Sequence, residues 1–250
     1  MRKLIASGDE LDVDALIAGL DLAGRAPEDR PYTIVNFAAS VDGRATVEGR
    51  SGGLGDAGDK QIFRALRGAA DGVLVGTGTL RAESYGRLIK DPHRRRSRAA
   101  RGLSPEPVAA TVTRSGRLPT GIPLWAEPEA RVVVFSGAPI DDFGARADVA
   151  VVTRDPAELT MAAVLGDLRH RHGVRLLLCE GGPGLFAALL REQLVDELFL
   201  TVAPKLVAGE SVAITSGDAV EVPAGLTLTW VLEGSGSLFL RYTTQELRFR

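Results

Sequence analysis

Glu180-Gly181-Gly182-Pro183-Gly184 lies between the apolar run Val174 to Cys179 and the amphipathic stretch Leu185 to Leu194. This order predicts a buried strand, a glycine-rich turn and a helix, which is a unit of an α/β fold. Unpaired backbone N–H groups and the helix dipole both favour an anion at such a helix N-terminus. The sequence therefore predicts a phosphate-binding loop here.

The segments before this loop begin a parallel sheet. Tyr32 to Phe37 is rich in β-branched and aromatic residues and predicts a buried strand, and Gly72 to Gly76 predicts a second, short one. Between them, Asp59 to Arg67 has apolar residues at helical spacing, with Asp56 or Asp59 as the N-cap. Thr77 to Leu80 predicts a helical turn. Strand, helix and strand in succession favour parallel pairing.

The middle of the chain alternates expected strands and helices. Ala157 to Arg171 has the clearest helical pattern, whereas Arg81 to Arg101 holds eight Lys or Arg against two acids without periodicity and predicts a loop. We expect buried strands at three further places: Pro107 to Thr113, Arg131 to Phe135 and Asp148 to Val152.

The C-terminal part changes character. Glu197 to Val202, Leu226 to Leu232 and Leu238 to Thr243 predict strands without intervening helices, and Gly234-Ser235-Gly236 suits a hairpin turn. The expected fold is thus α/β: a mixed, mostly parallel sheet flanked by helices and finished by an antiparallel C-terminal edge.

The first thirty residues are expected to stand apart from this sheet. Leu11 to Leu20 has helical spacing, and the proline-containing run from Ala26 to Pro31 then interrupts it. The interpretation is an N-terminal appendage over residues 1–30 and a single domain over residues 31–250.

Composition restricts the class of function. A chain of 250 residues with 45% apolar residues can fill a core, and a net charge of -2 gives no reason to expect nucleic acid, so a small-molecule partner is expected. One cysteine and three histidines argue against disulfides and against a metal site. Met1 to Glu10 is too short an apolar stretch for a secretory signal, and no run approaches a membrane span, so we expect a cytoplasmic protein.

Three loops that follow strands are expected to meet at one edge of the sheet: Asn36 to Gly43, Gly76 to Thr79 and Glu180 to Gly184. The alternative for each is an ordinary tight turn. Gly76-Thr77-Gly78 is not a dinucleotide fingerprint, because Arg81 stands where a third glycine is needed, and there is no P-loop. The three loops together predict a phosphate cradle of another kind.

Charged residues near these loops carry the candidate chemistry. Arg114 and Ser115 follow the Pro107 to Thr113 strand and could bind the 2′-phosphate of NADPH, or form a solvated turn. Asp42 either orients or protonates a substrate or only forms an Asp-Gly turn. Glu180 ends an apolar strand and is placed for a ligand amide or hydroxyl, or for the helix N-terminus.

Several ordered motifs resemble the reductase domain of the riboflavin-biosynthesis deaminase–reductase family, which has the dihydrofolate reductase-like fold. They are Asn36 to Gly43 with Ser-x-Asp-Gly, Ala70 to Thr79, Glu180 to Leu185, and Leu194 to Leu198 leading to Ala203-Pro204-Lys205-Leu206. The resemblance runs from about Pro31 to the C-terminus. The zinc-deaminase motifs of the bifunctional members, His-x-Glu and Pro-Cys-x-x-Cys, do not occur.

This resemblance implies NADPH-dependent reduction of the ribosyl group of 5-amino-6-(5-phosphoribosylamino)uracil, or a close pyrimidine, to a ribityl chain, by a homodimer. With the loop argument, it assigns Asp42 and Glu180 to catalysis. The expected cofactor contacts are Ala39, Gly76, Gly78, Thr79, Glu83, Arg114, Ser115, Gly181, Gly182, Pro183, Gly184 and Leu185. The expected substrate contacts are Asn36, Ser40, Ser51, Arg67, Arg87 and Glu180, with the substrate phosphate near Arg87 to Lys90.

One departure from the family leaves the substrate open. Glu83-Ser84-Tyr85-Gly86 replaces the Asp-x-Pro that usually follows the Gly-Thr segment. A dihydrofolate, pterin or other heterocycle reductase on the same fold is therefore the first alternative. A nucleotide-binding protein without catalysis is the second.

Overall fold

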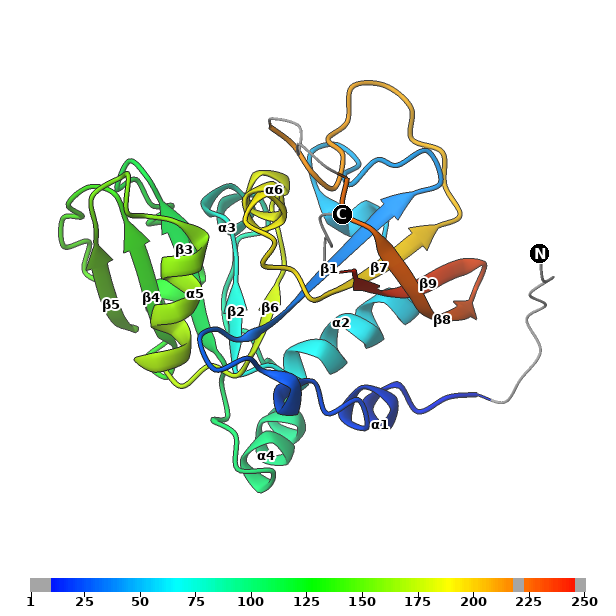
Figure 1. Cartoon of the computed structure of the whole chain (residues 1–250), viewed down its shortest axis with the longest axis horizontal. Helices are drawn as coiled ribbons and strands as arrows, with labels where there is room; N and C mark the ends of the chain where they lie inside the picture. Colours follow the sequence, from blue (N-terminus) through cyan, green and yellow to red (C-terminus); the bar gives the residue numbers. More distant parts are fainter. Residues whose placement is uncertain (1–9, 218–222, 246–250) are drawn as a thin grey trace, which may run out of the picture.

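The computed structural model describes residues 10–217 and 223–245. A nine-stranded sheet with the strand order β5-β4-β3-β2-β6-β1-β7-β9-β8 runs through the whole molecule (Figure 1). Every neighbouring pair from β5 to β7 is parallel, and β9 pairs antiparallel with both β7 and β8. The predicted mixed sheet with an antiparallel C-terminal edge is confirmed.

The strands are β1 (Tyr32–Ser40), β2 (Gly72–Leu74), β3 (Val108–Thr113), β4 (Arg131–Ser136), β5 (Asp148–Thr153), β6 (Leu176–Cys179), β7 (Glu197–Ala203), β8 (Leu226–Gly234) and β9 (Ser237–Thr244). The α-helices are α1 (Val13–Ala18), α2 (Ala57–Ala69), α3 (Thr77–Ala82), α4 (Pro92–Ala100), α5 (Met161–His170) and α6 (Pro183–Arg191). Short 3₁₀ turns are η1 (Leu22–Arg25), η2 (Ser51–Gly53) and η3 (Pro123–Ala126).

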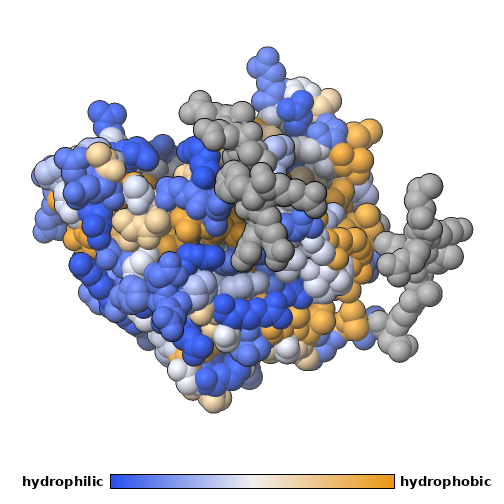
Figure 2. Space-filling view, in the orientation of Figure 1, coloured by the Kyte–Doolittle hydropathy of each residue, from blue (hydrophilic) through white to orange (hydrophobic). Residues whose placement is uncertain are grey.

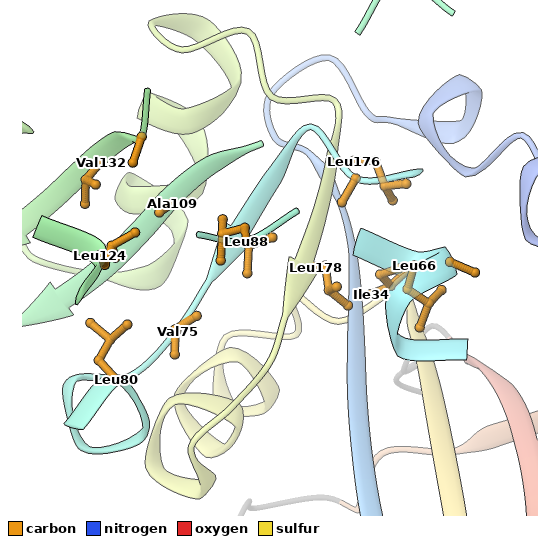
Figure 3. Packing of buried hydrophobic residues seen from close by; sticks show 14 of the residues in the cluster. Ile34, Leu66, Val75, Leu80, Leu88, Ala109, Leu124, Val132, Leu176 and Leu178 are labelled. Atoms are coloured by element: carbon orange, nitrogen blue, oxygen red, sulfur yellow. The ribbon is translucent and has the colours of Figure 1, made fainter. Parts of the chain in front are cut away.

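Alternate residues of the central strands enter two apolar layers, as the period of a strand requires. Ile34 and Leu178 face the layer that α1 and α2 cover, and Figure 3 shows Leu66 of α2 packed on them. Val35 and Cys179 face the layer that α5 and α6 cover. Because both faces are buried, these strands read as continuous apolar runs.

Two local predictions, a helix cap and a hairpin turn, are confirmed in detail. The Asp56 side chain caps α2 by accepting from the Asp59 N–H, so Asp56 rather than Asp59 is the N-cap. Ser235 and Gly236, both with positive φ, form the two-residue turn between β8 and β9, as the glycine-flanked sequence indicated.

The expected loop at Arg81 to Arg101 is wrong, because it contains α4. Asp91 caps this helix and Pro92 opens it, two signals that the basic composition obscured. Arg98 is 1% exposed and donates to the carbonyls of Gly68 and Ala70 at the end of α2. The helix thus depends on a tertiary contact that periodicity does not reveal.

Two further expectations need correction. The strand predicted at Asp148 to Val152 forms, but as the sheet edge it is not buried: Val151 is 44% exposed. The segment before Pro31 is not separate from the core, since Val13, Ile17 and Leu22 pack into the layer beside α2. Residues 1–9, on which the signal-peptide expectation partly rests, lie outside the described residues.

A buried ion pair joins β7 to β9. Glu197 is fully buried, and both of its carboxylate oxygens accept from Arg241, at 2.6 and 2.7 Å. Tyr32 and Arg25 also donate to this carboxylate. Burial and the neighbouring Glu197 raise the pKa of Tyr32, so the phenol stays protonated and donates.

We predict that Arg241→Met lowers the free energy of unfolding by about 3 to 5 kcal/mol, because it leaves the Glu197 carboxylate buried without its main partner. Arg25→Met is the control: this arginine contacts the same carboxylate but is 46% exposed, so the expected loss is under about 1 kcal/mol. Urea denaturation followed by circular dichroism measures both, and equal losses would contradict the assignment.

Candidate functional site

A cavity of about 890 Å³ lies at the carboxyl ends of β1, β2, β3 and β6. All three predicted segments reach it: Asn36 to Ala38 in the carboxyl-terminal half of β1, Gly76 to Thr79 after β2, and Glu180 with Gly182 to Leu185 after β6. The loop expected from Asn36 is wrong over its first part, because β1 continues to Ser40. Figure 1 shows α3 and α6 side by side at this edge. The three segments therefore meet at the carboxyl-terminal edge of the parallel strands, as predicted.

Glycine is required where the β2 and β6 loops touch. The Gly76 N–H donates to the Gly181 carbonyl at 2.7 Å, so the two backbones are in contact. Gly181 has φ +87°, and a Cβ there would lie 2.8 Å from the Phe37 ring. A Cβ on Gly182 would lie 2.9 Å from the Thr79 hydroxyl. A side chain at Gly181 would meet the Phe37 ring of β1 and one at Gly182 would meet the Thr79 side chain, and the positive φ of Gly181 itself favours glycine.

The N-terminus of α6 opens on the cavity. Gly182 is its N-cap, and its first turn receives no side-chain cap among the described residues. Pro183 has no N–H and the Leu185 N–H donates to the Gly182 carbonyl at 3.0 Å, so the N–H groups left for a ligand are those of Gly182 and Gly184. The helix dipole and free N–H groups together suit an anion.

Glu180 belongs to a different wall of the same cavity. Arg67 of α2 donates to both of its carboxylate oxygens, at 2.5 and 2.6 Å, and the Tyr85 hydroxyl donates at 2.7 Å. Phe63 packs on the guanidinium, 4.3 Å from its ring centroid. Glu180 is only 8% exposed, so water hydrates it poorly, and the two hydrogen bonds from Arg67 stabilise its negative charge instead.

The protonation states in this wall follow from its charges. Burial acts against the charged form of Arg67, but Glu180 outweighs it and raises the pKa of the guanidinium. Burial and the nearby carboxylate raise the pKa of Tyr85 well above its usual value. Tyr85 is therefore a protonated donor to Glu180, and Arg67 remains a cation.

Three glutamate side chains surround the Arg87 guanidinium. Its guanidinium forms ion pairs with Glu127, at 2.9 Å, and with Glu129, while Glu106 lies 3.7 Å away. These side chains hold the segment after Tyr85 in place. Lys60 and Lys90 also line the cavity, and each is exposed.

Most of the predicted site residues line this one cavity. They are Asn36, Ser51, Arg67, Gly76, Gly78, Thr79, Glu83, Arg87, Arg114, Glu180, Gly182, Pro183, Gly184 and Leu185. The residues that the structure does not place in its lining are Ala39, Ser40, Asp42, Ser115 and Gly181. Gly181 shapes the loop by its backbone, and Ser115 is exposed beyond Arg114.

Asp42 organises a loop outside the cavity. Its carboxylate accepts from the Ser40 hydroxyl at 2.5 Å and from the backbone N–H groups of Val207 and Ala208. These bonds lower its pKa to about 2, so the group is a carboxylate acceptor rather than an acid at neutral pH. Asp42 thus contacts Ser40, another predicted site residue, but neither side chain lines the cavity.

On α2, three residues that line the cavity were not predicted as site residues: Asp59, Lys60 and Phe63. Asp59, Phe63 and Arg67 are spaced by four, so they share one face of the helix. Arg67 was expected in the site. The same spacing was therefore a signal for Asp59 and Phe63, although apolar Phe63 reads equally as core.

Among residues 10–217 and 223–245, no three or more His, Cys, Asp or Glu side chains gather as metal ligands would. Over the same ranges, no helix has both the length and the apolar character to cross a membrane.

Known proteins resemble this chain in sequence. The chain is 33% identical over 196 residues to the 2,5-diamino-6-ribosylamino-4(3H)-pyrimidinone 5′-phosphate reductase of Archaeoglobus fulgidus, covering 76% of this chain and 88% of that protein. It is 30% identical over 185 residues to the riboflavin biosynthesis protein RibD of Mycobacterium tuberculosis, covering 74% of this chain and 45% of the other.

The fold is also known. The pyrimidine reductase-like protein of Corynebacterium diphtheriae superposes with a TM-score of 0.74 at 23% identity, covering 94% of this chain and all of the other. The expected dihydrofolate reductase-like architecture is thus confirmed. The family model of the RibD C-terminal domain matches residues 31–237, and the chain therefore belongs to the RibD C-terminal domain family.

Proposed function

We propose that this chain is an NADPH-dependent pyrimidine reductase of riboflavin biosynthesis. It reduces the ribosyl group of 5-amino-6-(5-phosphoribosylamino)uracil, or of a close pyrimidine, to the ribityl product. One observation carries the proposal: in a member of this family, a single cavity joins an uncapped helix N-terminus to a buried Glu180–Arg67 pair. These two walls suit a dinucleotide and a polar second ligand respectively.

The residues present fit a dinucleotide. The start of α6 would hold its diphosphate, and Arg114 lines the cavity at the end of β3. β3 is two strands from β6, so about 10 Å separates the two places, within the reach of an adenosine 2′-phosphate. Arg114 is exposed, and among the described residues its side chain makes one hydrogen bond, at 3.3 Å to the Pro156 carbonyl, so its other donors suit a phosphate.

When bound, NADPH supplies a hydride to C1′ of the sugar. The chain's own part is to position the two ligands and exclude water. Phe37 stacks on Phe186 behind the glycine loop, with 5.4 Å between the ring centroids. Glu180, fixed by Arg67 and Tyr85, presents a charged edge to the sugar hydroxyls, and Lys60 and Lys90 lie on the rim for its phosphate.

We further propose that the chain forms a homodimer through β8 and β9. Leu226, Leu228 and Leu238 on these strands are 41 to 47% exposed, and Figure 2 shows apolar surface on this side of the molecule. Light scattering at micromolar concentration is expected to give twice the chain mass. A monomer there would contradict this proposal and leave the catalytic one intact.

Arg114→Ala is predicted to weaken NADPH binding about tenfold and to leave NADH binding within twofold, because only NADPH carries the 2′-phosphate. Arg117→Ala is the control, since Arg117 is exposed after the same strand but does not line the cavity. Calorimetric titration of both cofactors measures the effect. Equal losses for NADH and NADPH would contradict the assignment of Arg114.

Glu180→Gln is predicted to lower kcat/KM for the phosphoribosylaminopyrimidine at least about 100-fold, because the substrate wall loses the charge that orders Arg67. NADPH affinity should change less than threefold. Tyr85→Phe removes one hydrogen bond but keeps the ion pair, so a loss under tenfold is expected. NADPH oxidation at 340 nm follows both variants.

The same assay tests the function itself. Wild-type turnover on the pyrimidine and none on dihydrofolate is the expected result. A clear preference for dihydrofolate would show that the substrate is dihydrofolate rather than the pyrimidine. If NADPH binds but neither compound oxidises it, a non-catalytic nucleotide-binding protein would be favoured.

A further inference from the structure

Arg98 of α4 is a buried cation without an acidic partner. Its side chain is 1% exposed, and none of the ion pairs among the described residues includes it. Burial lowers the pKa of this guanidinium to about 10, so it is still a cation at neutral pH. A buried charge needs hydrogen bonds in place of water. The groups that accept from Arg98 therefore define its role.

Backbone carbonyls at the end of α2, which α4 packs against (Figure 1), accept these hydrogen bonds. Nη1 donates to the carbonyls of Arg67, Gly68 and Ala70, at 3.1, 3.0 and 2.7 Å. Nε donates to the Ser104 carbonyl at 2.9 Å. The last carbonyls of an α-helix have no partner within the helix and lie at the negative end of its dipole. Arg98 therefore completes the last turn of α2 from outside the helix.

The same turn of α2 carries Arg67, whose guanidinium belongs to the cavity wall. That guanidinium donates to both carboxylate oxygens of Glu180 and to the Leu88 carbonyl. Arg98 contacts the other end of this residue, its backbone carbonyl. Helix ends fray where their last carbonyls lack partners, and a bidentate ion pair needs both of its groups in one plane. The orientation of the Arg67 guanidinium thus depends on the Arg98 contact.

A second arginine reaches the same helix end without contacting the Arg67 carbonyl. Arg101 donates from Nη2 to the Gly68 carbonyl at 2.7 Å, and its side chain is exposed. Both arginines bring a positive charge to the negative end of the α2 dipole. Only the Arg98 side chain, among the described residues, donates to the Arg67 carbonyl. Comparing the two side chains therefore separates a general effect on α2 from an effect on Arg67.

We propose that Arg98 is a positioning residue for the cavity: it holds the last turn of α2 so that Arg67 stays in bidentate contact with Glu180. Arg98 does not line the cavity, so its effect on a ligand passes through Arg67. This role rests on the proposed function where turnover is measured, because the wall that Arg98 positions is the one assigned to the pyrimidine.

Arg98→Met removes the donors and keeps a long side chain in the buried position. It is expected to lower kcat/KM for the phosphoribosylaminopyrimidine at least about tenfold and to leave the NADPH dissociation constant within about twofold of wild type. Arg101→Met is the matched control and should stay within about twofold in both measurements. Arg98→Lys keeps a cation that can donate to one of the carbonyls, so it should recover kcat/KM to within about threefold of wild type.

A double-mutant cycle separates positioning from a general loss of stability. In Glu180→Gln the wall has already lost the charged partner of Arg67, so adding Arg98→Met should cost less than about a further threefold in kcat/KM. Circular dichroism at the assay temperature confirms that each variant is folded. If the two losses multiply in full, Arg98 acts on the fold as a whole, and the proposal is overturned.

The Arg67 Nε–H proton gives a readout without turnover. Its ¹⁵N–¹H signal is identified by its absence from Arg67→Lys, and in the wild type it should exchange slowly with solvent, because it donates to buried Glu180. Exchange at least about tenfold faster in Arg98→Met, with Arg101→Met like the wild type, is the expected result.

Unchanged exchange in Arg98→Met, or an equal acceleration in Arg98→Met and Arg101→Met, would overturn the proposal. If no pyrimidine oxidises NADPH, the proposed function fails, and the exchange rate of the Arg67 proton still decides the role of Arg98.

Discussion

The close approach of two backbones, at Gly76 and Gly181, is the constraint on which the site depends. Their 2.7 Å hydrogen bond holds the ends of the β2 and β6 loops together, and space for side chains is missing at Gly181 and Gly182. Once the loops are joined, α3 and α6 must leave the sheet side by side. The uncapped first turn of α6 then faces the cavity, where an anion compensates its free N–H groups.

The same strand end divides the cavity into two walls. Beyond Cys179 the chain turns, so Glu180 meets α2 while the residues after Gly181 begin α6. A buried carboxylate would repel a diphosphate if it stood free, but Arg67 neutralises it. Two ligands can therefore occupy one cavity: an anionic one beside the helix N-terminus and a polar one beside the ion pair. This division was already expected from the sequence and is the basis of the proposed reductase.

Local patterns predicted the parallel strands well, because a strand buried on both faces must be apolar throughout and bounded by turns. They failed where a tertiary contact decides the structure. α4 depends on Arg98 reaching the end of α2. The spacing of Leu11 to Leu20 did predict a helix where α1 forms, but not its packing on the apolar surface beside α2. In the site, the glycine-rich loop from Glu180 to Gly184 could be predicted from its composition alone. The hydrogen bond between Tyr85 and Glu180 could not be predicted, because no sequence spacing relates residues that far apart. Asp42 lies in a predicted turn, but its carboxylate binds the backbone of a neighbouring loop rather than lining the cavity.

In the proposed function, the first turn of α6 holds the diphosphate of NADPH. The most direct measurement is the NADPH dissociation constant of Gly184→Asp beside that of Gly184→Ala. A Cβ at this position meets only Ser216, at 3.9 Å, and an acid near a helix N-terminus does not destabilise it, so both variants should fold. Binding at least about 100-fold weaker for Gly184→Asp, with Gly184→Ala within tenfold of wild type, is the predicted result. Equal affinities for the two variants would contradict it.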